Sequence, residues 1–270
     1  MNMFIIDNEV FIRLGFFFGI FGFMAAWEII APRRSLTNPK STRWFNNLMI
    51  TFLNSALVRL VFPVTAIGVA LFSAQRGWGI FNVIMDTRQW ITGAIAIVVL
   101  DLTIYAQHVF FHKIPLFWRL HRMHHTDLDI DVTTGARFHP IEIILSMVIK
   151  MAVVIILGAP AWAVLSFEVL LNATSMFNHS NVLMNQKLDR LLRIFLVTPD
   201  MHRVHHSVII KETDSNFGFN LPWWDRLFGT YRDQPVAGHE AMTVGLANYR
   251  EHKWLALPWM LFVPFSDKYR

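Results

Sequence analysis

The sequence predicts an all-α integral membrane protein, a bundle of about four to five membrane-embedded helices with a histidine-rich cap on the cytoplasmic side. Three observations predict this class. Only 16% of the 270 residues are charged and 54% are hydrophobic, whereas a soluble domain carries about 25% charged residues. Apolar stretches of about 20 residues, the length that spans a bilayer, recur along the chain. Most of the 12 histidines fall into short clusters.

The apolar stretches give the predicted helices in order. They are residues 11–30, 48–72, 90–109, 141–157 and 161–177. Pro63 interrupts the second stretch, since proline cannot donate a backbone hydrogen bond inside a helix. Gly158-Ala159-Pro160 separates the last two stretches, which are therefore expected to form a helical hairpin.

Charged residues interrupt these stretches at Arg13, Glu28, Arg59, Asp101, Lys150 and Glu168. Several of them lie near helix ends, where long side chains can reach the membrane surface. Arg59 and Asp101 lie deeper, and charges inside a membrane usually face the interior of the bundle. An ion pair between Arg59 and Asp101 is one way to neutralise both charges.

The orientation follows from the charge of the loops, because cytoplasmic loops are rich in lysine and arginine. The loop after the first stretch holds four cations and no acid: Arg33, Arg34, Lys40 and Arg43. With this loop in the cytoplasm, the third stretch returns there near His108, and everything after His179 lies there too. All the histidine clusters then share one side of the membrane, and a bacterial inner membrane is expected.

This interpretation divides the chain into three parts. Residues 1–99 hold the N-terminal transmembrane helices, and residues 100–231 hold the histidine clusters in a catalytic domain. Residues 232–270 form a tail, whose apolar end is broken by Pro258 and Pro264 and is expected to lie at the membrane interface.

The histidine clusters are the strongest chemical signal. They are His108-x-x-x-His112, His121-x-x-His124-His125 and His202-x-x-His205-His206. Residues at i, i+3 and i+4 share one face of a helix, so each cluster directs two or three imidazoles to one point. Eight histidines exceed the four ligands of a single zinc ion and suit two metal ions with positions left for oxygen. Imidazole binds iron, zinc and copper, and the absence of cysteine excludes thiolate and iron–sulfur sites.

Carboxylates near the clusters are candidates for orienting the imidazoles. A metal-bound histidine usually donates its other N–H to a carboxylate or a carbonyl. Asp127 follows the second cluster, Asp200 precedes the third, and Asp225 lies further along the chain. Each is expected to orient a histidine, or else to be an ordinary surface acid or helix cap.

In these clusters the sequence resembles the fatty acid hydroxylase / sterol desaturase superfamily, over residues 100–231. Flanking segments extend the resemblance: Arg137-Phe138-His139-Pro140, Asn178-His179-Ser180-Asn181, Thr198-Pro199-Asp200-Met201, Asn216-Phe217-Gly218-Phe219-Asn220 and Trp224-Asp225-Arg226-Leu227-Phe228-Gly229-Thr230. The resemblance implies a membrane-bound non-haem di-iron oxygenase that hydroxylates or desaturates a lipid with O₂.

The resemblance also implies the ligands and partners. The eight cluster histidines would hold two iron ions, with zinc able to replace iron in the isolated protein. His179 would be a ninth ligand, in the place of the family's additional histidine box. His139 is either a further ligand or the residue that starts a helix before Pro140. Electrons would come from a separate reductase, ferredoxin or cytochrome, because no haem or flavin domain is evident.

Two other functions remain open from the sequence. A desaturase would use the same site with a different substrate position. A non-enzymatic membrane metal-binding protein is the alternative of another class, although a carrier usually places its ligands along a path through the bilayer. The net charge of +5 requires no nucleic-acid partner. Sterols, fatty acyl chains, alkyl ethers and carotenoids are all possible substrates.

Overall fold

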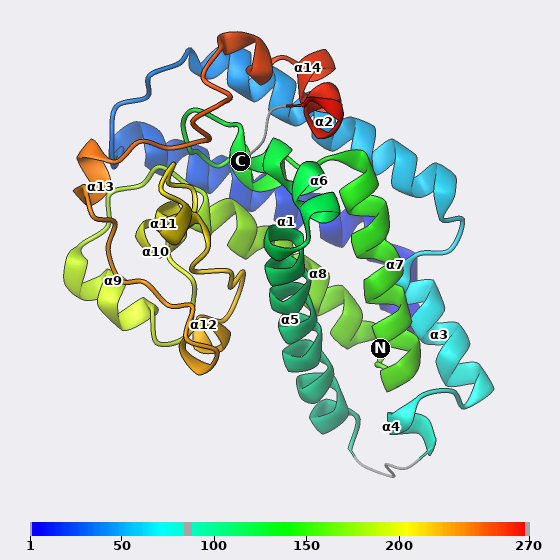
Figure 1. Ribbon diagram of the computed structural model, residues 1–270. Helices are drawn as coiled ribbons and strands as arrows, with labels where there is room; N and C mark the ends of the chain where they lie inside the picture. Colours follow the sequence, from blue (N-terminus) through cyan, green and yellow to red (C-terminus); the bar gives the residue numbers. More distant parts are fainter. Residues whose placement is uncertain (1, 84–87, 268–270) are drawn as a thin grey trace.

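The fold is entirely helical. The computed structural model describes residues 2–83 and 88–267, and no strand occurs among them (Figure 1). Residues 84–87 of the predicted N-terminal part and residues 268–270 of the tail lie outside this description. The predicted all-α class is confirmed.

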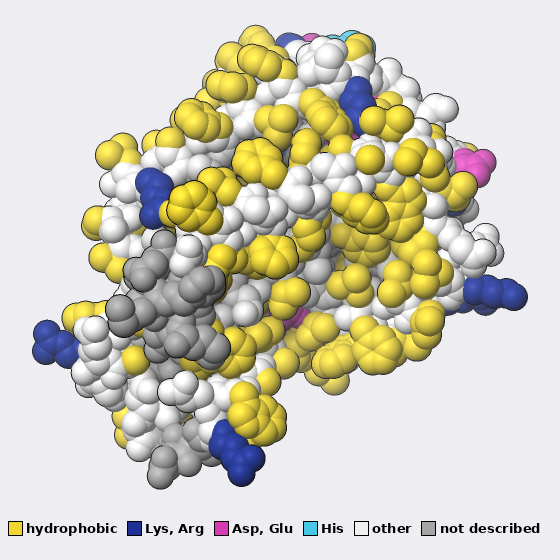
Figure 2. Space-filling view, turned by 180° about the vertical axis from the view of Figure 1, so that it is seen from behind, with side chains coloured by type: hydrophobic (Ala, Val, Ile, Leu, Met, Phe, Trp, Pro, Cys, Tyr) yellow, Lys and Arg dark blue, Asp and Glu magenta, His cyan; other side chains and the backbone are white. Residues whose placement is uncertain are grey.

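The larger helices match the apolar stretches of the sequence. They are α1 (Asn2–Ile30), α2 (Lys40–Val61), α3 (Ala66–Arg76), α5 (Gln89–Lys113), α7 (Pro140–Leu157) and α8 (Ala161–Asn178). Four helical segments are long and apolar enough to cross a membrane: Asn8–Ile30, Lys40–Val83, Gln89–Lys113 and Pro140–Leu157. The chain is therefore a multi-pass membrane protein. Figure 2 shows one face of it covered with hydrophobic side chains, with Lys and Arg mostly at the edges.

The predicted breaks between helices are confirmed. The segment with Pro63 separates α2 from α3. α7 ends at Gly158, which adopts φ +67°, and α8 begins at Ala161, so the two form the expected hairpin. A Cβ atom on Gly158 would lie 2.7 Å from the carbonyl oxygen of Trp78, so only glycine fits there without a shift of the neighbouring turn.

α2 begins earlier than the apolar stretch that starts at residue 48. Its first turns carry Arg43, Asn46 and Asn47, all of which are buried. Hydropathy alone misses these turns because their polar side chains bind other parts of the protein instead of lipid.

The shorter helices gather beside and beyond the ends of the long ones (Figure 1). They are α4 (Ile80–Val83), α6 (Pro115–His125), α9 (Gln186–Leu192), α10 (Pro199–His205), α11 (Ile210–Thr213), α12 (Trp223–Leu227), α13 (Gly238–Ala241) and α14 (Leu257–Phe262). The tail that contains α14 packs on the cap: Met260 and Val263 are buried in one cluster with Ile50 and Trp118. Arg122 also donates hydrogen bonds to the carbonyl oxygens of Val263 and Ser266.

The apolar core lies among α3, α5, α7 and α8. Leu100, Val154 and Phe167 are among its buried side chains. α5 and α8 approach closely at Gly93, where a Cβ atom would overlap the indole of Trp162. The packing of these helices holds the end of α5, and the histidines on it, in a fixed position.

Asp101 and Arg59 do not form the pair that was considered. The carboxylate of Asp101 instead accepts hydrogen bonds from Trp224 Nε1 at 2.8 Å and from the backbone N–H of Leu221 at 3.3 Å. Arg59 lies on the exposed face of α2. Asp101 therefore ties α5 to the segment around α12, a contact between residues far apart in the sequence.

Arg43 joins α2 to the loop that follows the second histidine cluster. Its guanidinium is fully buried and donates to both carboxylate oxygens of Asp127, at 2.7 and 2.9 Å, and to Asp131. Burial raises the pKa of Asp127, but the charge of Arg43 outweighs it and lowers that pKa to about 2. The loop is thus held by one buried cation between two carboxylates.

We predict that Arg43→Met destabilises the protein by about 3–5 kcal/mol, because it leaves buried carboxylates without their cation. The midpoint of thermal unfolding in detergent measures the effect. Arg59→Met is the matched control, since Arg59 is exposed, and it should change stability by about 0.5 kcal/mol or less. Equal midpoints for the two variants would contradict the assigned role of Arg43.

Candidate metal centre

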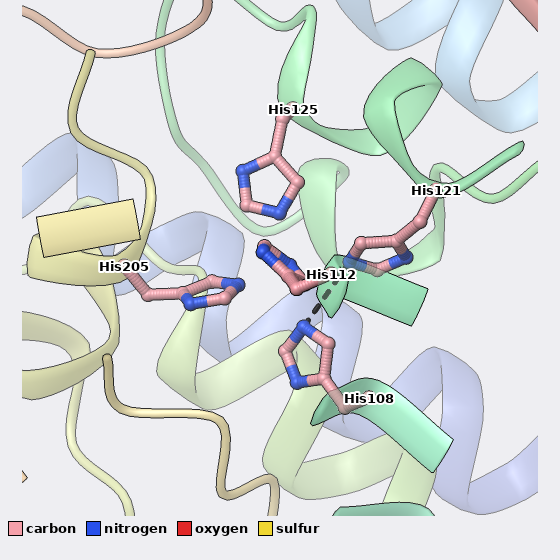
Figure 3. A group of neighbouring side chains, drawn as sticks. All are labelled: His108, His112, His121, His125 and His205. Carbon is pink, nitrogen blue, oxygen red and sulfur yellow. Dashed lines mark hydrogen bonds between the residues drawn. The ribbon is translucent and has the colours of Figure 1, made fainter. Parts of the chain in front are cut away.

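Nine histidines from four parts of the chain meet in two adjoining groups. In each group the candidate ligand atoms lie within 4.8 Å of one another, and all the histidines are buried. The first group is His108, His112, His121, His125 and His205, and the second is His124, His179, His202 and His206. Figure 3 shows the first group, with the imidazoles pointing toward a common centre. The eight cluster histidines and His179 are thus brought together.

The spacing of the histidines along each helix places them on one helix face. His108 and His112 are one turn apart at the end of α5. Pro115 opens α6 immediately afterwards, because proline suits the first position of a helix. Thr198 caps α10 by accepting a hydrogen bond from the backbone N–H of Met201. These caps fix where the short helices begin and hence where their histidines point.

Backbone carbonyls fix the orientation of four imidazoles. A carbonyl oxygen can only accept, so the Nδ1 atom that faces it must carry the hydrogen and donate. The unprotonated Nε2 atom is then free to bind a cation. The four Nδ1–carbonyl pairs are His108 with Phe217 (2.7 Å), His124 with Arg137 (3.0 Å), His179 with Ser175 (2.8 Å) and His205 with Ser215 (2.7 Å).

Carboxylates approach two further imidazoles. His121 Nδ1 lies 2.7 Å from Glu142 Oε1, and His112 Nδ1 lies 3.5 Å from Asp214 Oδ1. A carboxylate behind a metal-binding histidine holds its ring in place and strengthens it as a ligand. Glu142 and Asp214 are therefore the acids that orient this centre.

The Nε2 atoms form a donor set that fits metal cations. His108 Nε2 lies 3.1 Å from His121 Nε2, and His124 Nε2 lies 3.1 Å from His179 Nε2. Because Nδ1 carries the hydrogen in His124 and His179, the lone pairs of their Nε2 atoms face each other, and a shared cation would relieve the repulsion. The buried Nε2 atoms of His125, His205 and His206 also have no hydrogen-bond partner among the described residues.

Burial keeps the imidazoles in the neutral form that binds metals. It lowers the pKa of His121 and of His179 to about 3. It also lowers the pKa of His206, with neighbouring histidines adding to the effect. Each group could hold one ion, and an all-imidazole donor set suits iron, zinc or copper.

Comparison with known proteins agrees with this geometry. The fatty acid hydroxylase family model matches residues 93–230, about half of the chain. The chain belongs to the fatty acid hydroxylase family. Relatives of this fatty acid hydroxylase family member are named as lipid-modifying oxygenases.

Three curated relatives of this hydroxylase family member are informative. An ornithine lipid hydroxylase, OlsE, from Rhizobium tropici is 25% identical over 251 residues, which cover 92% of this chain and 73% of the relative. An alkylglycerol monooxygenase from Homo sapiens is 28% identical over 55% of this chain, and one from Xenopus tropicalis is 30% identical over 48%. This chain spans only 31% and 28% of those two monooxygenases. No solved structure matches it.

His139 is not brought to either group. It caps the start of α7, where its Nδ1 accepts a hydrogen bond from the backbone N–H of Ile141 at 3.2 Å. Its Nε2 lies 3.3 Å from the carbonyl oxygen of Leu261 in the tail. The position before Pro140 therefore starts a helix, which is the other of the two roles expected for it.

Asp127 and Asp200 are placed against arginines instead of the cluster imidazoles. Asp127 accepts from Arg43, as described above. Asp200 accepts from Arg203 and from Arg33 Nε, the latter at 3.2 Å. Both acids are close to the clusters in sequence, but Asp200 lies on another face of α10 than the histidines and Asp127 lies in the loop after α6. Their carboxylates therefore meet arginines and not the cluster imidazoles.

Asp225 acts on the centre only through the backbone. It accepts hydrogen bonds from the N–H groups of Phe217 and Gly218, both at 2.8 Å. The carbonyl of Phe217 is the acceptor for His108. Asp225 thus holds the loop at Phe217 and Gly218, and the carbonyl group of that loop orients His108.

Glu142 and Asp214 were not identified from the sequence. Glu142 is an isolated carboxylate in the apolar stretch 141–157, and acids within membrane segments commonly mark a functional site. The sequence alone could therefore have pointed to Glu142 as a candidate site residue. Asp214 carries no such signal, because nothing local relates it to His112, about a hundred positions away.

A cavity of about 330 Å³ adjoins the first group. His108, His121 and Glu142 line it at one end, together with the rings of Phe111, Phe138 and Phe219. The ring of Phe138 stacks on His124 with 4.4 Å between centroids. A substrate in this cavity would lie beside the imidazoles in a largely apolar environment.

We predict that Glu142→Leu weakens metal binding by about 10- to 100-fold, because His121 loses the acceptor that orients it. Glu142→Gln is the matched control, since the amide oxygen can still accept from Nδ1, and its effect should be smaller. Competition with a chelator, followed by elemental analysis, measures the retained metal. Wild-type retention in the leucine variant would contradict this role for Glu142.

We also predict that His124→Ala and His205→Ala each remove about half of the bound metal or more, since each disrupts one group of ligands. His139→Ala should keep the wild-type metal content, because His139 caps α7 outside both groups. Elemental analysis of the purified variants gives the result. Metal loss in His139→Ala comparable to that in His124→Ala would show that His139 is a ligand after all.

Proposed function

We propose that the protein is a non-haem di-iron oxygenase that hydroxylates a membrane lipid with O₂. The observation that carries the proposal is the pair of adjoining imidazole groups, whose Nε2 atoms converge beside a cavity in the membrane-embedded bundle. Nine histidines are more than one ion needs, so each of the two groups would hold one ion. Iron is proposed because inserting oxygen into an unactivated C–H bond needs a redox-active metal, and zinc would bind without supplying this chemistry.

The overall reaction defines what else the protein needs. A C–H bond, O₂, two electrons and two protons give a C–OH group and one water. Bound iron would supply the activation of O₂. The electrons would come from a separate reductase, ferredoxin or cytochrome.

The residues of this chain would position the ligands and exclude water. Four backbone carbonyls would keep the Nε2 atoms of their histidine partners directed at the centre. They belong to Phe217, Arg137, Ser175 and Ser215. Phe138, which stacks on His124, and the other rings of the cavity wall would keep the reacting carbon away from water.

The relatives support a lipid substrate. One is named for the hydroxylation of an ornithine lipid and others for the monooxygenation of alkylglycerols. The cationic loop that carries Arg33 and Arg34 supports a cytoplasmic position for the histidines, since positive loops stay inside. A bacterial inner membrane is the proposed location.

We predict that cells expressing the wild-type chain under ¹⁸O₂ contain a lipid with one ¹⁸O atom that is absent from cells expressing His124→Ala. Mass spectrometry of the extracted lipids identifies it. His252→Ala is the matched control, because His252 is exposed and outside both groups, and it should behave as wild type.

Other outcomes would change the assignment. A lipid that lacks two hydrogens and carries no label would make the enzyme a desaturase with the same site. Labelled product in His124→Ala would contradict the proposed site. Identical lipids in all strains, with purified protein that holds metal and a reductant supplied, would favour a non-enzymatic metal-binding protein.

A further inference from the structure

Four charged side chains lie inside the membrane-embedded bundle, on α1, α7 and α8. Glu168 lies between two cations and accepts hydrogen bonds from Arg13 and from Lys150. Arg13 also donates to Glu9 at 2.9 Å. The carboxylate of Glu168 is only 5% exposed and the side chain of Lys150 only 12%. Charges at such positions are costly, and they commonly mark the path of a substrate.

These charges line the cavity that reaches the histidines. Arg13, Lys150 and Glu168 all border the cavity of about 330 Å³ that His108 and His121 also border. Lys150 lies eight residues after Glu142 on α7, which is about 12 Å along the helix axis at about 1.5 Å per residue. The charges are therefore about a headgroup's length from the metal centre.

A second cavity, of about 700 Å³, continues from the same charges toward the lipid-facing side. Arg13 and Glu168 border both cavities. The second cavity lies between α1, α2 and α8, and hydrophobic side chains such as Leu14, Phe52 and Val169 line it. Glu9 and Arg59 border it as well. Its walls suit an acyl chain, and the charges stand where such a chain would meet a polar headgroup.

The wall of the first cavity also offers acceptors that need a donor. Asn54 Oδ1 and Gln107 Oε1 are buried and have no hydrogen-bond partner among the described residues, and both residues border the cavity. A buried acceptor without a partner is unfavourable by about 1–3 kcal/mol. A purely hydrocarbon substrate would leave them unpaired, whereas an ammonium or hydroxyl group could donate to them.

We propose that Arg13, Lys150 and Glu168 bind the charged headgroup of a zwitterionic lipid. The acidic group of the headgroup meets Arg13 and Lys150, and its ammonium meets Glu168 and the free acceptors. The two cavities are lined by equal numbers of basic and acidic side chains, namely Arg13, Arg59 and Lys150 with Glu9, Glu142 and Glu168. A headgroup without net charge therefore adds no net charge to the membrane interior. Sterols, carotenoids and other lipids without a charged headgroup are then poor ligands. This assignment of the substrate class rests on the proposed function.

The test is lipid binding by the purified, metal-loaded protein in detergent, without O₂ or an electron donor. Native mass spectrometry compares three probes with identical acyl chains: zwitterionic phosphatidylethanolamine, anionic phosphatidylglycerol and neutral diacylglycerol. The wild type should bind phosphatidylethanolamine at least about tenfold more tightly than diacylglycerol, as charge-assisted hydrogen bonds imply. Phosphatidylglycerol should bind more weakly than phosphatidylethanolamine.

A charge-balanced double variant separates binding from folding. Lys150→Met with Glu168→Gln removes one charge of each sign and should abolish the preference for phosphatidylethanolamine. Lys253→Met with Glu251→Gln removes an exposed ion pair and should leave the preference unchanged. Unchanged metal content in both variants shows that they are folded.

Each result decides the proposal. Wild-type protein that binds diacylglycerol as tightly as phosphatidylethanolamine would overturn it, and so would a folded Lys150/Glu168 variant that keeps the preference. Tighter binding of phosphatidylglycerol would replace the zwitterion with an anion. If the preference is found but no ¹⁸O enters a lipid in cells, the proposed oxygenase fails while the headgroup site stands. If ¹⁸O enters but no preference is found, the headgroup site alone fails.

Discussion

The crowding of nine buried imidazoles is the constraint on which the rest of the structure depends. Rings whose Nε2 atoms lie 3.1 Å apart favour two conditions: the neutral form of the imidazoles and a cation bound between them. Burial provides the first condition, as the lowered pKa of His121 shows. The second fits the observation that His108, His124, His179 and His205 are held by carbonyls on the Nδ1 side. The Nε2 atoms of His125, His205 and His206 have no hydrogen-bond partner among the described residues.

Much of the cap serves to hold the acceptors behind these rings. The loop with Phe217 orients His108, and the N–H groups of that loop are held by Asp225. The loop with Arg137 orients His124. Near its start, Arg43 pairs with Asp127. Buried charges at these positions thus act on the candidate metal centre indirectly, by holding the loops whose carbonyl groups face the imidazoles.

The membrane-embedded helices contribute a cavity as well as an anchor. One cavity is lined by His108 and His121, and a second, more apolar cavity shares Arg13 and Glu168 with it. A lipid could therefore reach the metal centre without leaving the bilayer. The charges that interrupt the apolar stretches are not all explained by helix ends: Lys150 and Glu168 face the cavity from the middle of α7 and α8, where an ion pair also links the two helices.

The sequence by itself determined the helical membrane class, the hairpin at Gly158 and the histidines that meet, because these follow from local apolar length, backbone conformation and residue spacing. The tertiary structure alone decided which acids orient them. Asp127 and Asp200 are near in sequence but point to arginines, whereas Asp214 reaches His112 from a distant segment. A carboxylate's partner depends on the direction in which its side chain points and on long-range packing, and neither can be read from the distance along the chain.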